Sequence, residues 1–184
     1  MMRFQGNKMI AAIGALACAA TFHVTLQAQG SGAVPSDPQI VGIVVAANQI
    51  DIDYARLALQ KSKNKEVRGF AQQMETDHSA LQKAVGNLGA KLNVTPAESD
   101  TSKALKAQAQ QTTRRLNVLQ GSAFDKAYVD NEVAYHKAVI NAVSTVLIPN
   151  AQNAELKKAL QGADPLFQGH LEHAQMVQEH LQAQ

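Results

Sequence analysis

NKEVRGFAQQMETDHSALQKAVGNLGAKL, residues 64–92, is the stretch that decides the fold of this chain. Its apolar residues recur every three or four positions, which is the spacing of one face of an α-helix. They are Val67, Phe70, Ala71, Met74, Leu81, Val85, Leu88 and Leu92. Asn64 belongs to the residue types that cap helix starts. His78 lies inside the apolar stripe, so the stretch predicts a long amphipathic helix that buries an ionisable side chain.

The helical periodicity continues on both sides of this stretch. Before it, Asp37 resembles an N-cap and Pro38 a first-turn proline, so a helix is expected from there to about Lys61. After it, a strongly apolar helix is expected to begin at a cap on Ser122 and to end at Pro149-Asn150. These two helices supply further apolar faces for a common core.

Two more helices complete the predicted set. The last one is expected to begin near Gln152 and contains Pro165, which removes a backbone hydrogen bond and either bends the helix or divides it in two. A shorter, more polar helix is expected from about Thr101 to Leu119. Because no strand alternation or glycine-rich phosphate loop occurs, we predict an all-α, antiparallel four-helix bundle with an additional shorter helix over residues 38–182.

The composition agrees with a helical core. Hydrophobic residues make up 46% of the 184 residues and aromatic residues only 4%, with no Trp. Such a core is built mainly from Ala, Val and Leu, and the length corresponds to about one domain.

Residues 1–28 have the pattern of an export signal. Arg3 and Lys8 give a positive start, an almost wholly apolar run follows from Met9 to Leu26, and small residues surround Ala28. Cleavage is expected after Ala28, while the length of the apolar run leaves an uncleaved N-terminal anchor open as the alternative. We therefore expect a protein exported to the periplasm or outer envelope, with envelope or membrane association through the N-terminus where the segment stays attached.

The remaining chain is formally neutral. Residues 29–37 are rich in Gly, Ser and Pro and are expected to form a flexible tether. Removing Arg3 and Lys8 with the signal lowers the 17 basic residues to 15, against 15 acidic ones. Without a basic face, nucleic acid is not an expected partner. The only Cys lies in the signal, so the mature chain has no disulfide or thiolate chemistry.

Ionisable residues interrupt the apolar faces of four predicted helices. Besides His78, they are Asp51 in the first helix, Glu132 and His136 in the strongly apolar helix, and His170 in the last one. Such groups are not expected on a buried face unless they are paired or used. Counting residues from the turns of an antiparallel bundle, at the helical rise per residue, places the three histidines at one level. Asp51 and Glu132 lie about one turn nearer to one end.

Three imidazoles with carboxylates one turn away are ligands suited to a transition metal such as iron, manganese or zinc. Glu75 forms a Glu-x-x-His pair with His78, an arrangement found in di-iron carboxylate bundles, and Glu132 precedes His136 by one turn. Glu75 and His173 are weaker candidates because they lie toward the flanks of their helices. Our metal-site hypothesis therefore rests on Asp51, His78, Glu132, His136 and His170.

Two interpretations without a metal stay open. In the first, the protein is a metal-free envelope interaction or stress-related module, whose inward histidines are hydrogen-bonded core residues that fix the helix register. In the second, buried neutral histidines become charged in acid and make the protein pH-responsive. Asp77, on the opposite flank from Glu75, is expected to make a polar contact between helices. The sequence lacks a complete duplicated Glu-x-x-His set, so no enzymatic activity is assigned.

Several blocks of the sequence resemble a known family. They are DIDYARLA at 51–58, VRGFA at 67–71 with Met74 and Asp77-His78, FDKAY at 124–128 with His136, and His170-Leu171 with Ala174. The chain resembles, over roughly Ile40 to Leu181, the exported bacterial proteins classed as domain-of-unknown-function family 4142 of the ferritin-like superfamily. The resemblance implies a ferritin-like bundle in the periplasm or envelope, without a settled activity. The family commonly has Glu where this chain has Asp51, whose shorter side chain needs a closer helix to reach a metal.

Overall fold

The computed structural model describes residues 34–183, and every regular element in this range is helical. The elements are α1 (Asp37–Lys61), α2 (Lys65–Leu92), α3 (Asp100–Asn117), α4 (Gly121–Ala142), the π-helical segment η1 (Val143–Leu147), α5 (Ile148–Asn150) and α6 (Ala154–Gln182). The predicted all-α class is confirmed. The predicted signal and most of the predicted tether lie outside the described residues. Within residues 34–183, no helix combines the length and the hydropathy that a membrane span requires.

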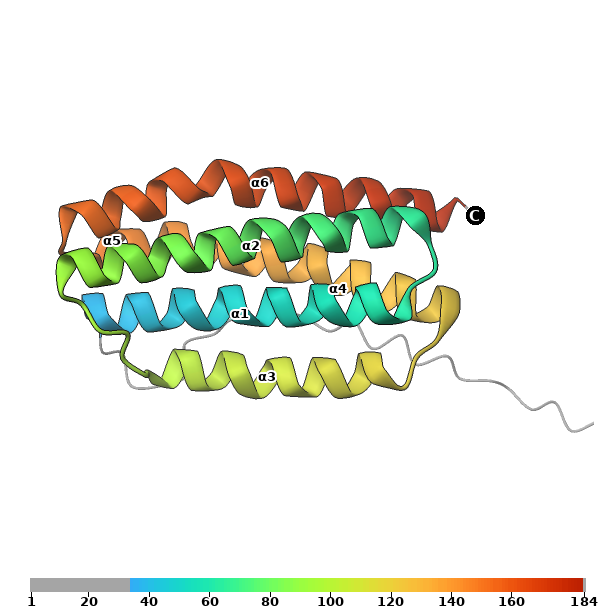
Figure 1. Cartoon of the computed structure of the whole chain (residues 1–184), viewed down its shortest axis with the longest axis horizontal. Helices are drawn as coiled ribbons and strands as arrows, with labels where there is room; N and C mark the ends of the chain where they lie inside the picture. Colours follow the sequence, from blue (N-terminus) through green and yellow to red (C-terminus); the bar gives the residue numbers. More distant parts are fainter. Residues whose placement is uncertain (1–33, 184) are drawn as a thin grey trace, which may run out of the picture.

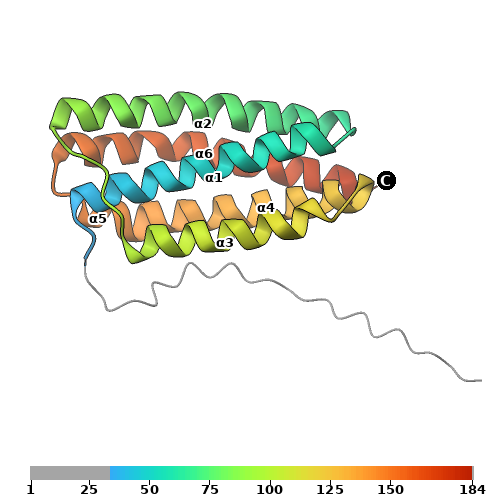
Figure 2. The same ribbon diagram turned by 60° about the horizontal axis from the view of Figure 1, so that its bottom comes forward.

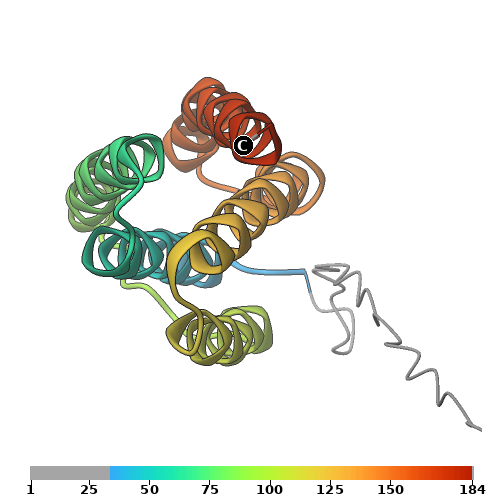
Figure 3. The same ribbon diagram turned by 90° about the vertical axis from the view of Figure 1, so that its right-hand side faces the viewer.

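The four long helices form a bundle of two antiparallel pairs, α1 with α2 and α4 with α6 (Figure 1). The additional helix α3 lies outside the bundle against α1 and α4 (Figures 2 and 3). It carries the chain from the end of α2 back to the start of α4, so α2 and α4 run parallel. One long crossover between two antiparallel pairs is the connectivity of ferritin-like folds. The predicted bundle with one additional shorter helix is therefore confirmed.

The start of α1 differs from the prediction that Asp37 caps it. Ser36 is the N-cap, and its backbone N–H donates to Oε1 of Gln39 at 3.0 Å. Asp37 is instead the first helical residue, and its carboxylate accepts the backbone N–H groups of Gln152 and Asn153 at 2.8 and 2.9 Å. The acid that resembled a local cap thus ties the beginning of α1 to the beginning of α6.

The starts of α2 and α4 give one confirmation and one correction. Asn64 caps α2 as predicted, because its side-chain oxygen accepts two backbone N–H groups of the first turn at 2.9 and 3.2 Å. The predicted cap at Ser122 is wrong. The N-cap is Gln120, two residues earlier, and helix α4 begins at Gly121. Gly121 has a φ of +55°, a conformation that glycine adopts without a steric penalty.

The second half of the bundle contains two irregular features. The run from α4 ends at Asn150 as expected, but through the π-helical turn η1, which the periodicity did not indicate. Pro165 lies inside α6, which continues through it as one helix with a visible bow (Figure 1). Of the two alternatives for this proline, the bent helix is the one observed. Asn153 caps α6, which places the helix start at Ala154 rather than near Gln152.

The interior is filled unevenly along the bundle axis. The end at the α1–α2 turn holds the largest fully buried side chains, among them Phe70, Phe124 and Tyr128. The crossover helix α3 buries only Ser102, Leu105 and Leu116, in line with its weak apolar face. Between the aromatic end and the opposite end lies a layer of buried ionisable side chains.

Candidate metal centre

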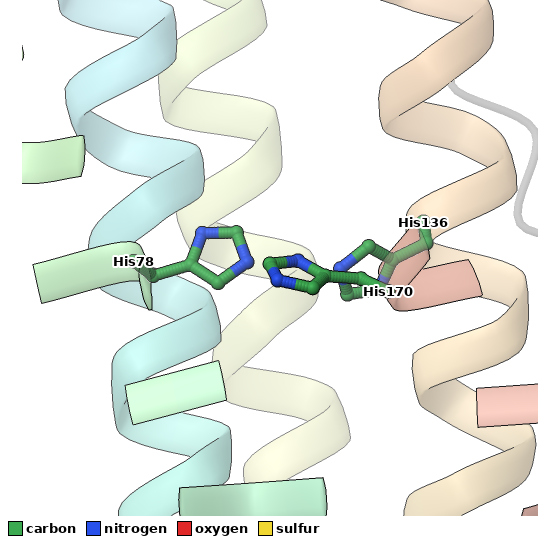
Figure 4. Close-up of side chains that lie close together, drawn as sticks. All are labelled: His78, His136 and His170. Atoms are coloured by element: carbon green, nitrogen blue, oxygen red, sulfur yellow. The ribbon is translucent and has the colours of Figure 1, made fainter. Parts of the chain in front are cut away.

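Each of the four bundle helices contributes to one buried polar layer, which we call the His-carboxylate layer. It consists of Asp51 on α1, His78 on α2, Glu132 and His136 on α4, and His170 on α6, all of them at most 4% exposed. The three imidazole rings face one another in the centre of the bundle (Figure 4). The sequence prediction that the three histidines share one level is therefore confirmed.

The distances in the layer are those of groups able to share one ion. One nitrogen from each of His78, His136 and His170 lies within 4.8 Å of the other two, and the same holds for ligand atoms of Asp51, Glu132 and His136. Oδ2 of Asp51 lies 3.3 Å from Nε2 of His78 and 3.6 Å from Nε2 of His136. Two ligands of a tetrahedral ion with bonds near 2.0–2.1 Å stand about 3.4 Å apart. These groups can therefore hold a metal ion with small side-chain adjustments.

A hydrogen-bond chain fixes the proton of His78. The side-chain amide of Asn48 donates from Nδ2 to the backbone carbonyl of Val44 at 3.0 Å, which directs its Oδ1 toward the ring. Oδ1 of Asn48 lies 2.8 Å from Nδ1 of His78, and because Oδ1 can only accept, Nδ1 donates. In the neutral imidazole, Nε2 then carries a lone pair directed at Asp51.

The other two imidazoles are held in the same way. Nδ1 of His136 donates to the backbone carbonyl of Glu132 at 3.1 Å, and Nε2 of His170 donates to Oδ2 of Asp77 at 3.0 Å. In each ring the second nitrogen is left as an acceptor. Metal-ligating histidines commonly have one N–H held by a carbonyl or carboxylate and the other nitrogen free for the ion. The expected interhelical contact of Asp77 is thus confirmed, with His170 as its partner.

Unpartnered polar atoms are concentrated in this layer. In the described part of the chain, eleven buried side-chain N or O atoms have no hydrogen-bond partner, and seven of them belong to the five layer residues. They are both carboxyl oxygens of Asp51 and Glu132, Nε2 of His78 and His136, and Nδ1 of His170. A buried polar group without a partner costs about 1–3 kcal/mol. A cation held by either group of converging ligand atoms would give partners to acceptors that have none.

Burial shifts the protonation of all five residues toward the uncharged forms. It raises the pKa of Asp51 to about 8, and together with the charge of Asp51 it raises the pKa of Glu132 well above its usual range. Burial also lowers the pKa of His78 to about 3 and that of His136 to about 4. The pKa of His170 is lowered for the same reason. At neutral pH the imidazoles are therefore neutral, and Asp51 is mostly protonated unless a cation displaces the proton.

The model of the family described as domain of unknown function, DUF4142, matches residues 23–177 of the chain. The chain belongs to this family. No curated protein and no solved structure gives a significant match. The description of the family names no activity, so the chemistry of this DUF4142 protein has to be inferred from the His-carboxylate layer itself.

Two further candidates from the sequence lie outside the layer of this DUF4142 protein. Glu75 points away and accepts from Nε of the half-exposed Arg56 at 2.8 Å. The ring of His173 packs edge-on against Phe70 with centroids 5.2 Å apart, and its Nδ1 lies 2.8 Å from Oε1 of Gln73. Neither residue joins the groups whose ligand atoms converge. The Glu-x-x-His spacing therefore brings only its histidine to the centre.

Sequence reasoning missed the residue that orients His78. Asn48 is buried on α1 with 3% of its surface exposed, one helical turn before Asp51. A polar residue one turn from a predicted ligand, on the same apolar face, is the signal that points to it. The short side chain of Asp51 approaches both His78 and His136, so it does reach the layer.

Proposed function

We propose that this protein binds one divalent transition-metal ion, namely iron, manganese or zinc, in the His-carboxylate layer. His78, His136, His170 and Asp51 supply the central ligands, and Glu132 supplies a further carboxylate. The single observation that carries the proposal is the group of seven buried, unpartnered polar atoms that belong to these five residues.

The type of these atoms supports a cation rather than a hydrogen-bonded core. The outer N–H of each imidazole is donated to Asn48, Glu132 or Asp77. The inner atoms are therefore three nitrogen lone pairs and four carboxyl oxygens, and the only protons available among them are those on the acids. The protons of Asp51 and Glu132 can make two hydrogen bonds, which satisfy at most four of these seven atoms, and a cation is needed for the rest.

Charge balance supports a divalent ion. Three neutral imidazoles and two carboxylates together carry two negative charges, which a divalent cation neutralises inside a low-dielectric interior. Nitrogen and carboxylate donors suit zinc, iron and manganese, whereas a thiolate-preferring ion finds no sulfur donor in this set. Binding releases the protons held by Asp51 and Glu132, so affinity is expected to rise with pH.

The test is metal analysis of the purified protein after reconstitution with iron, manganese and zinc separately. We expect about one ion per chain, and loss of that ion in the His78→Ala, His136→Ala double variant. His173→Ala is the matched control, because it removes a histidine outside the layer and should leave the metal content unchanged. Absence of stoichiometric metal with all three ions contradicts the proposal.

We further propose that metal is bound outside the cytoplasm, in the periplasm or outer envelope. The support is the pattern of residues 1–28, with a basic start, an apolar run and small residues near Ala28. The measurement is the intact mass of protein recovered from the periplasmic fraction, which should correspond to a chain that begins at Gln29. Recovery of the full-length chain from the cytoplasm alone contradicts this part of the proposal.

A further inference from the structure

A second feature of the interior lies beside the His-carboxylate layer. An elongated cavity of about 290 Å³ is lined by α1, α2, α4, η1 and α6, with Leu105 added from α3. It occupies the half of the bundle that leads to the α5–α6 turn. Its lining runs along α4 and η1 from His136 to Leu147, roughly 16 Å at the helical rise.

The cavity is apolar except at one end. Its polar lining residues are Asn48, Asp51, His78, Tyr135 and His136, and all of them lie at or next to the His-carboxylate layer. The hydroxyl of Tyr135 already donates to the carbonyl of Ala47 at 3.0 Å. The remaining walls are Ala, Val, Leu, Ile, Gly and Phe side chains. The cavity is thus a long apolar space with acceptor groups at its inner end.

The helix around the cavity departs from regular α geometry. Val143 and Leu147, the first and last residues of η1, both line the cavity. A π-helical turn is wider than an α-helical one and often occurs where a helix borders a functional site. The irregular turn therefore coincides with the wall of the cavity, at a distance from the layer itself.

Small side chains give the cavity a way to the surface. Ala84 on α2 and Ala159 on α6 both line it, and both are exposed. Residues that border the cavity and also contact solvent indicate that the space opens between these two helices. Longer side chains at the two positions would close the gap.

We infer that the cavity binds a single unbranched aliphatic chain that carries one small hydroxyl head group, with the head group at the His-carboxylate layer. Apolar cavities of about 150 Å³ stay dry and bind small apolar molecules, and this one is about twice as large. Its elongated shape fits an extended chain, and the unpartnered Nε2 of His78 can accept a hydrogen bond from the head group. The walls bind the chain whether or not the layer holds a metal.

The test is calorimetric titration of the purified, metal-free protein with primary alcohols from hexanol to decanol. Each added methylene group should tighten binding about fourfold, the equivalent of ~0.8 kcal/mol for a buried CH₂. The zinc-loaded protein should show the same dependence on chain length. An affinity that does not change with chain length overturns the inference.

Variants locate the binding site. The Ala84→Leu, Ala159→Leu double variant should weaken decanol binding at least tenfold, whereas Ala80→Leu, exposed on α2 and outside the cavity lining, should leave it unchanged. Ala163→Leu narrows the cavity from within and provides a second variant if the double variant loses helicity. Equal decanol affinity in the folded blocking variants contradicts the inference.

The two proposals can fail separately. Alcohol binding in a protein that takes up no metal removes the metal proposal and keeps the cavity inference. Stoichiometric metal in a protein that binds no alcohol removes the cavity inference and keeps the metal proposal.

Discussion

The two halves of the bundle interior differ on either side of the His-carboxylate layer. Toward the α1–α2 turn, Phe70, Phe124 and Tyr128 are completely buried, and the rings of Phe124 and Tyr128 stack with centroids 6.2 Å apart. Toward the α5–α6 turn, smaller aliphatic side chains leave a cavity of about 290 Å³. One half is filled by large aromatic side chains, and the other contains a cavity. The packed half provides a rigid base for the ligands, and the open half provides access to them.

Truncation in the packed half should have the largest effect on stability. Phe70→Ala removes a ring with no exposed surface and should lower the free energy of unfolding by about 3–5 kcal/mol. Leu160→Ala, whose side chain lines the cavity and makes contacts on fewer sides, should cost about 2 kcal/mol. Urea unfolding of both variants measures the difference. Equal losses would contradict the distinction between the two halves.

Metal should stabilise the layer between the two halves by a comparable amount. Zinc at a free concentration a hundredfold above its Kd adds about 2.7 kcal/mol to the free energy of unfolding, because it binds only the folded chain. Chelator should therefore lower the Tm of the loaded protein and leave His78→Ala unaffected. If the Tm of the wild-type protein is insensitive to chelator, the metal-free interpretation of the histidines is preferred.

The pH dependence of the metal-free protein should reveal the protonated acid in the layer. The pKa of Asp51 is raised from 3.8 to about 8, so the folded state binds more protons than the unfolded state in this range. Stability should therefore fall as pH rises, by about 2 kcal/mol from Asp51 between pH 6.5 and 8. Asp51→Asn should flatten this slope, as measured by urea unfolding at each pH.

The buried histidines make stability fall as pH is lowered, which is the opposite of the effect of Asp51. The pKa values of His78 and His136 are lowered to about 3 and about 4, so the unfolded state binds more protons below pH 6.5. Their contribution to stability is lost as pH falls from there toward 3. Unchanged helicity and compactness over that range would rule out a pH-responsive role.

Replacing a buried Ala by the larger Leu should have the smallest effect on stability, and the effect should differ in sign between the two halves. Ala163→Leu extends into the cavity and should stabilise the protein by about 1 kcal/mol. Ala71→Leu, at a position with no exposed surface in the packed half, should destabilise it by about 1–3 kcal/mol. Thermal unfolding of the two variants, which add the same atoms, compares the halves directly. Destabilisation by both would indicate that the cavity cannot accept a side chain.

The His-carboxylate layer was predictable because it depends on helix period and helix length alone. His78, His136 and His170 stand on apolar faces, and counting residues from the turns brings them to one level. The partner of His78 was not predictable in the same way, because the contact with Asn48 depends on side-chain rotamers across two helices.

The cavity and η1 could not be predicted from the sequence pattern either. A cavity depends on how the side chains of four helices fit together, and no single apolar stripe contains that information. The π-helical turn at Val143–Leu147 retains apolar residues at both ends, so its periodicity resembles that of an ordinary helix. Asp37 has the residue type of a local cap, whereas its actual partners, Gln152 and Asn153, are far away in the sequence.

That long-range contact of Asp37 has a mechanical consequence. Its carboxylate joins the first turn of α1 to the segment that starts α6, through two backbone N–H groups. A pulling force applied to the chain ahead of α1 is therefore shared between two helices at opposite ends of the sequence. The first turn of α1 cannot peel away alone, because these two hydrogen bonds have to break with it.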